Sequence, residues 1–140
     1  MANIEGARTK ERTKKTGEVF TPPPLINEML ENLPNEVWEE NKTFCDPAAG
    51  DGNFLVTVLA WKIAHGHDPT EALRSVYGVE LMKDNTLAIH RRLLRLAGDT
   101  PEHKAIVMDN IVWANSLEYD MQFDRKIDNR KSTNRLENSK

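Results

Sequence analysis

The stretch that decides the fold of this chain is Asp46-Pro47-Ala48-Ala49-Gly50-Asp51-Gly52-Asn53-Phe54-Leu55. It follows a short apolar run at residues 43–45 that is typical of a buried strand. It leads into an apolar run with helical periodicity that continues to about residue 65. Glycines allow close approach of the backbone to a ligand and dihedral angles that other residues avoid. The stretch therefore predicts a strand, a tight loop and a helix in succession.

The same alternation continues along the chain. We expect a short helix over 69–74, a strand over 75–80, a helix over 82–97 and a strand over 110–115. Upstream of the loop, apolar residues at helical spacing predict a helix that ends before Pro34. Strands alternating with helices indicate parallel strands joined by crossover helices. Such sheets bind ligands at the carboxyl ends of their strands.

Two smaller expectations concern the strands. Cys45 lies in the first predicted strand, so we expect a buried and unreactive thiol. Asp109 and Asn110 lie where the last predicted strand begins, and we expect a turn there.

Length and composition limit the class of protein. The chain has 140 residues, 39% apolar residues, a net charge of -3 and one cysteine. This length suits one domain. One cysteine excludes a disulfide framework and a cysteine-based zinc finger, and it favours a reducing, cytoplasmic setting. No window has the roughly 20 apolar residues of a membrane span, and the amino-terminal residues lack the apolar region of a secretory signal.

Charge is segregated along the chain. Residues 1–15 hold five basic and two acidic residues, and residues 124–140 hold six basic and three acidic residues, so each end has a net charge of +3. The stretch between them is acidic. We expect a flexible basic arm over 1–15, a domain over 16–123 and a disordered, basic polar tail over 124–140. Basic ends of this kind are either solvated tails or contacts for a polyanion.

The loop has the wrong residues for the common phosphate-binding motifs. No lysine follows its glycines, as a Walker loop requires, and Gly50 and Gly52 lack the third glycine of a dinucleotide fingerprint. Two carboxylates, Asp46 and Asp51, border the loop instead. They suit a ligand with a cationic group better than a pyrophosphate. The alternative is a plain strand-to-helix turn, which this combination of residues disfavours.

Glu80 is the last residue of the second predicted strand, 28 positions after Gly52. An acid at this place in a sheet of this type accepts hydrogen bonds from ribose hydroxyls. Alone, Glu80 would be interpreted as a solvated strand end. Together with the loop upstream, it predicts a nucleoside-binding residue.

Three motifs in this order resemble the adenine-N6 DNA methyltransferases. They are Gly17-Glu18-Val19-Phe20-Thr21-Pro22, the stretch 46–55, and Tyr77-Gly78-Val79-Glu80. More narrowly, they are similar to the subgroup with the cofactor motif at the amino end, as in type I modification subunits and related phage enzymes. The resemblance covers about residues 16–128. It implies S-adenosylmethionine as cofactor and an incomplete Rossmann-like class I methyltransferase fold, with about three parallel strands and flanking helices.

The resemblance also implies roles for individual residues. Phe20 and Thr21 would hold the methionine end of the cofactor, Glu80 would bind the ribose, and Leu81 or Met82 would lie against the adenine. Asn115 stands where the family has an acid that contacts the adenine, and its amide oxygen can still accept a hydrogen bond. The implied cofactor-binding set is Phe20, Thr21, Asp46, Pro47, Ala48, Ala49, Gly50, Asp51, Gly52, Phe54, Glu80, Leu81, Asn115, Ser116 and Leu117.

The catalytic segment departs from the family pattern. That pattern is a strand ending in Asn or Asp, then Pro-Pro and an aromatic residue that stacks on the flipped base. Asn129 falls on the Asn position, which makes it the candidate catalytic residue, but Arg130, Lys131 and Ser132 replace both prolines and the aromatic. We therefore expect the catalytic motif to be absent.

Two functions follow from these expectations. The first is the S-adenosylmethionine-binding part of a site-specific DNA adenine-N6 methyltransferase, which needs a missing segment or a second chain for methyl transfer. The second is a catalytically inactive S-adenosylmethionine-binding or interaction protein related to a phage or to restriction–modification. In both, DNA is the partner that the resemblance implies. No metal site and no membrane segment are expected, and the setting would be the cytoplasm of a bacterial or phage-infected cell.

Overall fold

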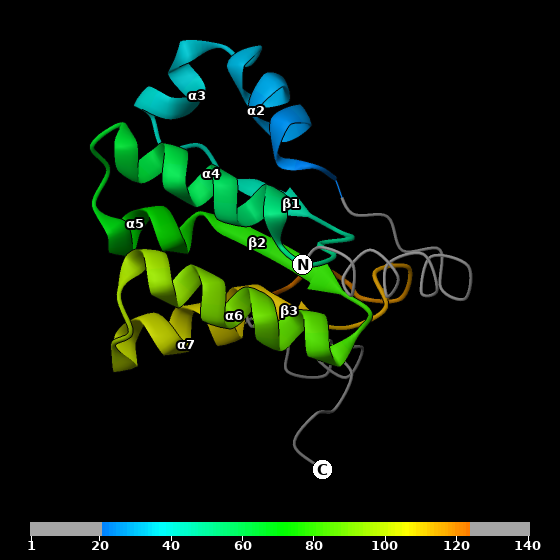
Figure 1. Cartoon of the computed structure of the whole chain (residues 1–140). Helices are drawn as coiled ribbons and strands as arrows, with labels where there is room; N and C mark the ends of the chain where they lie inside the picture. The colour runs from blue at the N-terminus through cyan, green and yellow to red at the C-terminus, as the bar shows by residue number, and fades with distance from the viewer. Residues whose placement is uncertain (1–20, 124–140) are drawn as a thin grey trace, which may run out of the picture.

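A computed structural model describes residues 21–123 of the chain. The three strands are separated by pairs of helices, in the order that the sequence predicts except for the additional helix α7 (Figure 1). The described elements are α2 (Pro23–Glu31), α3 (Asn35–Glu39), β1 (Phe44–Asp46), α4 (Asn53–Ala64), α5 (Pro69–Arg74), β2 (Val76–Glu80), α6 (Lys83–Ala97), α7 (Pro101–Asn110) and β3 (Ile111–Trp113). The basic arm and the basic tail predicted at the two ends lie outside the described residues.

The three strands form one parallel sheet in the order β1-β2-β3. Cys45 of β1 pairs with Tyr77 of β2, and Val79 of β2 pairs with Val112 of β3. All three carboxyl ends therefore meet at one edge of the sheet, where the loops into α4 and α6 begin (Figure 1). The prediction of an incomplete Rossmann-like α/β fold is confirmed.

The main core lies between one face of the sheet and the helices α4 and α6. Residues one turn apart on α4 and on α6 belong to the same buried cluster as Val76 of β2 and Ile111 of β3. Helix α4 comes so close to β2 that a Cβ on Gly78 would lie 2.6 Å from Cδ1 of Leu55. The buried centre of this core includes Leu55, Val58, Leu59, Val76, Ile89, Leu93 and Ile111.

The opposite face of the sheet has a smaller apolar cluster. Val79, Val112 and Ala114 pack there with Tyr119, and Met121 and Phe123 add to the cluster. The segment after β3 thus covers β2 and β3. The prediction for Cys45 is wrong, because this thiol is exposed. Its side chain alternates to the face away from the main core, where the described residues leave β1 uncovered.

The turn expected at Asp109 and Asn110 is also wrong, since both residues belong to helix α7. Thr100 caps this helix by accepting a hydrogen bond from the backbone N–H of His103 at 3.0 Å. Pro101 follows in the first turn, where its missing N–H costs nothing. None of the helices described here is long and apolar enough to cross a membrane.

Candidate functional site

The loop between β1 and α4 is held by hydrogen bonds to the sheet and within itself. The N–H of Ala49 donates to the carbonyl of Val79 at 3.0 Å, which ties the loop to β2. The N–H of Ala48 donates to Asp46 Oδ1 at 3.1 Å, and that of Gly52 donates to the carbonyl of Ala49 at 2.9 Å. The loop is therefore a defined structure at the carboxyl end of β1.

Gly52 is required at its position for two reasons. Its φ of +88° is unfavourable for residues with a Cβ, and a Cβ there would lie 2.7 Å from Cγ1 of Ile89 on α6. Gly50 also has a positive φ, of 60°. The glycines that the sequence singled out thus shape a sharp turn against α6.

Glu80 lies at the end of β2, buried with 4% of its surface exposed. Its Oε1 accepts from the N–H of Gly50 at 2.7 Å. Its Oε2 accepts from the N–H of Met82 at 3.0 Å and from Nδ2 of Asn85 at 3.2 Å. The carboxylate and the glycine loop, 30 residues apart in sequence, are therefore in direct contact.

The two aspartates of the loop are half-buried. Burial raises the pKa of Asp46 above its usual value, and the hydrogen bond from the N–H of Ala48 offsets part of this shift. A partly desolvated carboxylate gains more from a cationic partner than a solvated one does. Oδ1 of Asp51 accepts from the N–H of Asn53 at 3.1 Å, at the start of α4.

The segment after β3 lies beside Glu80. The N–H of Ala114 donates to the carbonyl of Glu80 at 3.0 Å. Oδ1 of the neighbouring Asn115 accepts from the N–H of Leu117 at 3.0 Å. A carbonyl oxygen has two lone pairs, so this bond leaves Asn115 able to accept another donor.

Two large apolar side chains are exposed at this edge of the sheet. Leu81, after β2, is 46% exposed and Leu117, after β3, is 93% exposed. Nε1 of Trp113 donates to the carbonyl of Leu81 at 2.9 Å, which links the two segments. Exposed apolar surface therefore lies next to the buried Glu80 carboxylate.

The structure places the remaining predicted residues as follows. The carbonyl of Thr21 accepts from Nδ2 of Asn53 at 3.3 Å, so the first motif reaches the loop. Pro47 and Ala48 are exposed in the loop, whereas Phe54 packs against the main core near Phe44. Phe20 and Asn129 lie outside the described residues.

Helix α6 supplies three contacts to this site that the sequence did not predict. Asn85, Ile89 and Arg92 follow each other at helical spacing and contact Glu80, Gly52 and the loop carbonyl of Asp51. The side chain of Arg92 is half-buried and donates two hydrogen bonds. Polar residues such as Asn85 on the buried side of an amphipathic helix are the sequence signal that could have indicated these contacts.

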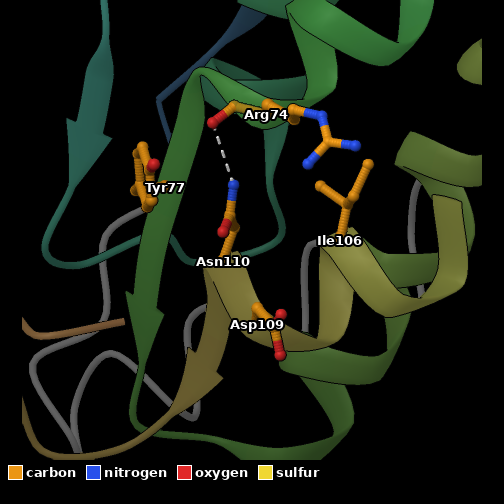
Figure 2. Close-up of a pocket in the computed structure, with 5 residues that line it drawn as sticks. All are labelled: Arg74, Tyr77, Ile106, Asp109 and Asn110. Carbon is orange, nitrogen blue, oxygen red and sulfur yellow. Dashed lines mark hydrogen bonds between the residues drawn. The ribbon is translucent and has the colours of Figure 1, made fainter. Parts of the chain in front are cut away.

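A cavity of about 180 Å³ lies at the other end of the strands. Figure 2 shows its lining, with Nδ2 of Asn110 donating to the carbonyl of Arg74 at 3.2 Å. Arg74 precedes β2 and Asn110 precedes β3, so this cavity borders the amino ends of the strands. It is separate from the edge where the carboxylates gather. Residues 21–123 include no cluster of three His, Cys, Asp or Glu side chains able to hold a metal ion.

Comparison with known proteins bears on the family of the whole chain. The sequence model of N-6 DNA methylases matches residues 6–137, nearly the whole chain. The chain belongs to the N-6 DNA methylase family. No curated protein and no solved structure matches it significantly. Membership in the N-6 DNA methylase family supports a DNA methyltransferase-like role for this chain, with DNA as the class of substrate.

Proposed function

We propose that this N-6 DNA methylase family chain binds S-adenosylmethionine at the carboxyl ends of its strands, as the cofactor-binding part of a DNA adenine-N6 methyltransferase. The observation that carries the proposal is the contact between the buried Glu80 carboxylate and the N–H of Gly50. It joins the acid at the end of β2 to the glycine loop after β1. Acid and loop at adjacent strand ends are the arrangement that nucleoside cofactors use in sheets of this type.

The residues of the site fit the chemical groups of this cofactor. Asp46, partly desolvated, would face its amino group, and Glu80 would accept hydrogen bonds from its ribose hydroxyls. Leu81 would lie against the adenine ring, and Asn115 would accept from its exocyclic amine. When bound, the cofactor supplies an activated methyl group on a sulfonium. The residues of this chain bind and orient it, and exclude water from its apolar side.

Methyl transfer needs a further element in this proposal. An adenine amine has to be held by an Asn or Asp and the flipped base stacked on an aromatic residue. The sequence after Phe123 has Asn129 followed by Arg130, Lys131 and Ser132 instead of Pro-Pro and an aromatic. Another segment or a second chain would complete the site. Within residues 21–123, β1 pairs only with β2 and is an edge strand of the sheet.

The same departure favours a second candidate function. In it, the chain is an inactive S-adenosylmethionine-binding or interaction protein connected with a phage or with restriction–modification. Both functions need the cofactor site. They differ in whether methyl transfer appears when the completing element is supplied.

Isothermal titration calorimetry with S-adenosylmethionine tests the shared step. We expect saturable binding by the wild-type chain. Asp46→Ala and Glu80→Ala should each raise Kd roughly 10- to 100-fold, because each removes a hydrogen-bonding partner that carries a charge. Asp99→Ala is the matched control, since this exposed aspartate lies beyond the far end of α6. Absence of heat with the wild type, or equal loss in the control, would contradict the proposal.

A further inference from the structure

Arg92 on α6 reaches back to the glycine loop over about forty residues of sequence. One nitrogen, Nη1, donates to the carbonyl of Asp51 at 2.8 Å and to Oδ1 of Asn53 at 2.9 Å. The first acceptor belongs to the loop and the second to the first residue of α4. Arginine stays charged at all working pH values, so both bonds are charge-assisted.

Asn53 also bonds to a third segment, the residues that precede α2. Because arginine can only donate, the oxygen of the Asn53 amide must face Arg92 and its NH₂ group must point away. That NH₂ group donates to the carbonyl of Thr21 at 3.3 Å. One side-chain amide therefore connects α6, the start of α4 and the segment that leads into α2.

The loop needs such support because its backbone is permissive. Gly50 and Gly52 have positive φ angles, and glycine populates alternative conformations readily. The contact between Gly52 and Ile89 limits the loop on one side by packing. Arg92 lies one turn further along α6 and fixes the orientation of the peptide that follows Asp51.

We propose that Arg92 is a positioning residue for the cofactor loop, and that Asn53 couples the loop to the segment at Thr21. The inference rests on the proposed cofactor site. Arg92 acts through the carbonyl of Asp51 and through Asn53, and it holds the loop in the conformation that presents Asp46 and Gly50 to the ligand. The ordering of the loop is thus built into the fold before a ligand arrives.

Hydrogen exchange of backbone amides, followed residue by residue without cofactor, separates this inference from the proposed function. Arg92→Ala should speed exchange at residues 50–53 at least fivefold and leave β2 and the core of α6 unchanged. Arg95→Ala, an exposed arginine one turn on, is the matched control and should change nothing. Unchanged exchange in the loop, or equally faster exchange throughout the domain, would overturn the positioning role.

Two conservative variants sharpen the test and cover the case in which Arg92→Ala fails to fold. Arg92→Lys keeps the charge, but its ammonium ends one bond short of the position of Nη1, so loop exchange should lie between wild type and Arg92→Ala. Asn53→Asp keeps an oxygen for Arg92 and removes the donor to Thr21. It should leave the exchange of residues 50–52 as in wild type, while the amides of Leu25 and Ile26, which donate to the Pro22 carbonyl, exchange faster because this segment loses its link to α4. Loop exchange in Arg92→Lys equal to that of wild type would contradict the positioning role, and loop exchange in Asn53→Asp equal to that of Arg92→Ala would contradict the coupling.

Cofactor titration then completes the design. Arg92→Ala should raise Kd for S-adenosylmethionine about tenfold, with Arg95→Ala unchanged. If the wild type binds no cofactor, the proposed function fails while the exchange data still decide whether Arg92 orders the loop. If the wild type binds and Arg92→Ala binds equally well, the positioning role fails and the proposed function stands.

Discussion

Two glycines with positive φ angles, one in the loop before α4 and one after that helix, differ in how closely neighbouring side chains approach them. Gly52 and Gly66 have φ angles of +88° and +96°. A Cβ at Gly52 would meet Ile89 at 2.7 Å, whereas a Cβ at Gly66 has nothing within 4 Å. The two positions share the backbone strain and differ in the steric contact, so they form a natural pair for comparison.

Gly52→Ala should therefore be the more damaging substitution. We expect Gly66→Ala to lower the free energy of unfolding by about 1 kcal/mol from backbone strain alone. Gly52→Ala should lower it by about 2–4 kcal/mol, because overpacking against Ile89 adds to the strain. Urea denaturation of both variants measures the difference. Equal losses would show that α6 does not constrain the loop.

The pH dependence of cofactor binding should report on Asp46. Burial holds the pKa of this carboxyl above its usual value. The ionised form attracts a cationic amino group, so affinity should be full above the raised pKa and fall as the pH decreases through it. The fall should begin at a higher pH than for an ordinary aspartate. Calorimetry between pH 4 and 7 should show this fall in wild type and a flatter profile in Asp46→Asn; matching profiles would exclude Asp46.

The residues of the site were predictable to different degrees. The loop and Glu80 were visible in the sequence, because strand ends and glycine turns have local signatures. Their contact was not visible, because only the parallel pairing of β1 with β2 brings Gly50 to Glu80. Arg92 was missed for a similar reason. The role of Arg92 depends on how α6 is rotated against the loop. The spacing of Arg91, Arg92 and Arg95 along the helix does not reveal that rotation.

At the scale of elements, helix α4 contains a fully buried lysine. Lys62 is 0% exposed, and its Nζ donates to Oδ1 of Asn41 at 2.7 Å and to the carbonyl of Lys42 at 2.5 Å. The same group lies 5.2 Å from the centre of the Phe44 ring. Lys62 thus ties the segment between α3 and β1 to α4, and burial lowers its pKa to about 8.

This lysine should make the stability of the domain depend on alkaline pH. The pKa of Lys62 is about 8 in the folded chain and near 10.5 in its ordinary state. Between these values the unfolded chain binds more protons, so the free energy of unfolding should rise with pH. The rise from this group should be about 1–3 kcal/mol between pH 8 and 10.5. Denaturation of wild type and Lys62→Met across this range should show the rise only in wild type; parallel curves would contradict it.

The elements themselves were largely predictable. Hydrophobic spacing located α4, α5, α6 and all three strands to within a few residues. Helix α7 was missed because its apolar residues are too few for a clear periodicity, although Thr100-Pro101-Glu102 is a typical helix start. The short apolar run around Cys45 predicts a buried strand, and the sequence alone does not show which face of that strand is covered. Cys45 is exposed because β1 is an edge strand of the described sheet and the small apolar cluster on that face lies over β2 and β3.

At the scale of the whole molecule, our proposal places every cofactor-binding element on the described sheet. The sequence after Phe123 has no Pro-Pro-aromatic catalytic motif. We therefore predict that this chain alone transfers no methyl group to DNA that contains adenine. Incubation with labelled S-adenosylmethionine and such DNA measures this directly. Transfer that disappears in Asn129→Ala would contradict the prediction and assign catalysis to the degenerate segment.

The most direct test of the central claim is an amide NMR spectrum of the labelled chain during titration with S-adenosylmethionine. The account predicts saturable shifts at Gly50, Gly52 and Met82, whose amides border the Glu80 carboxylate and the loop. Residues around Arg74 and Asn110, at the opposite end of the strands, should stay unchanged. Absence of any shift, or shifts confined to the Arg74 and Asn110 cavity, would contradict a cofactor site at the carboxyl ends of the strands.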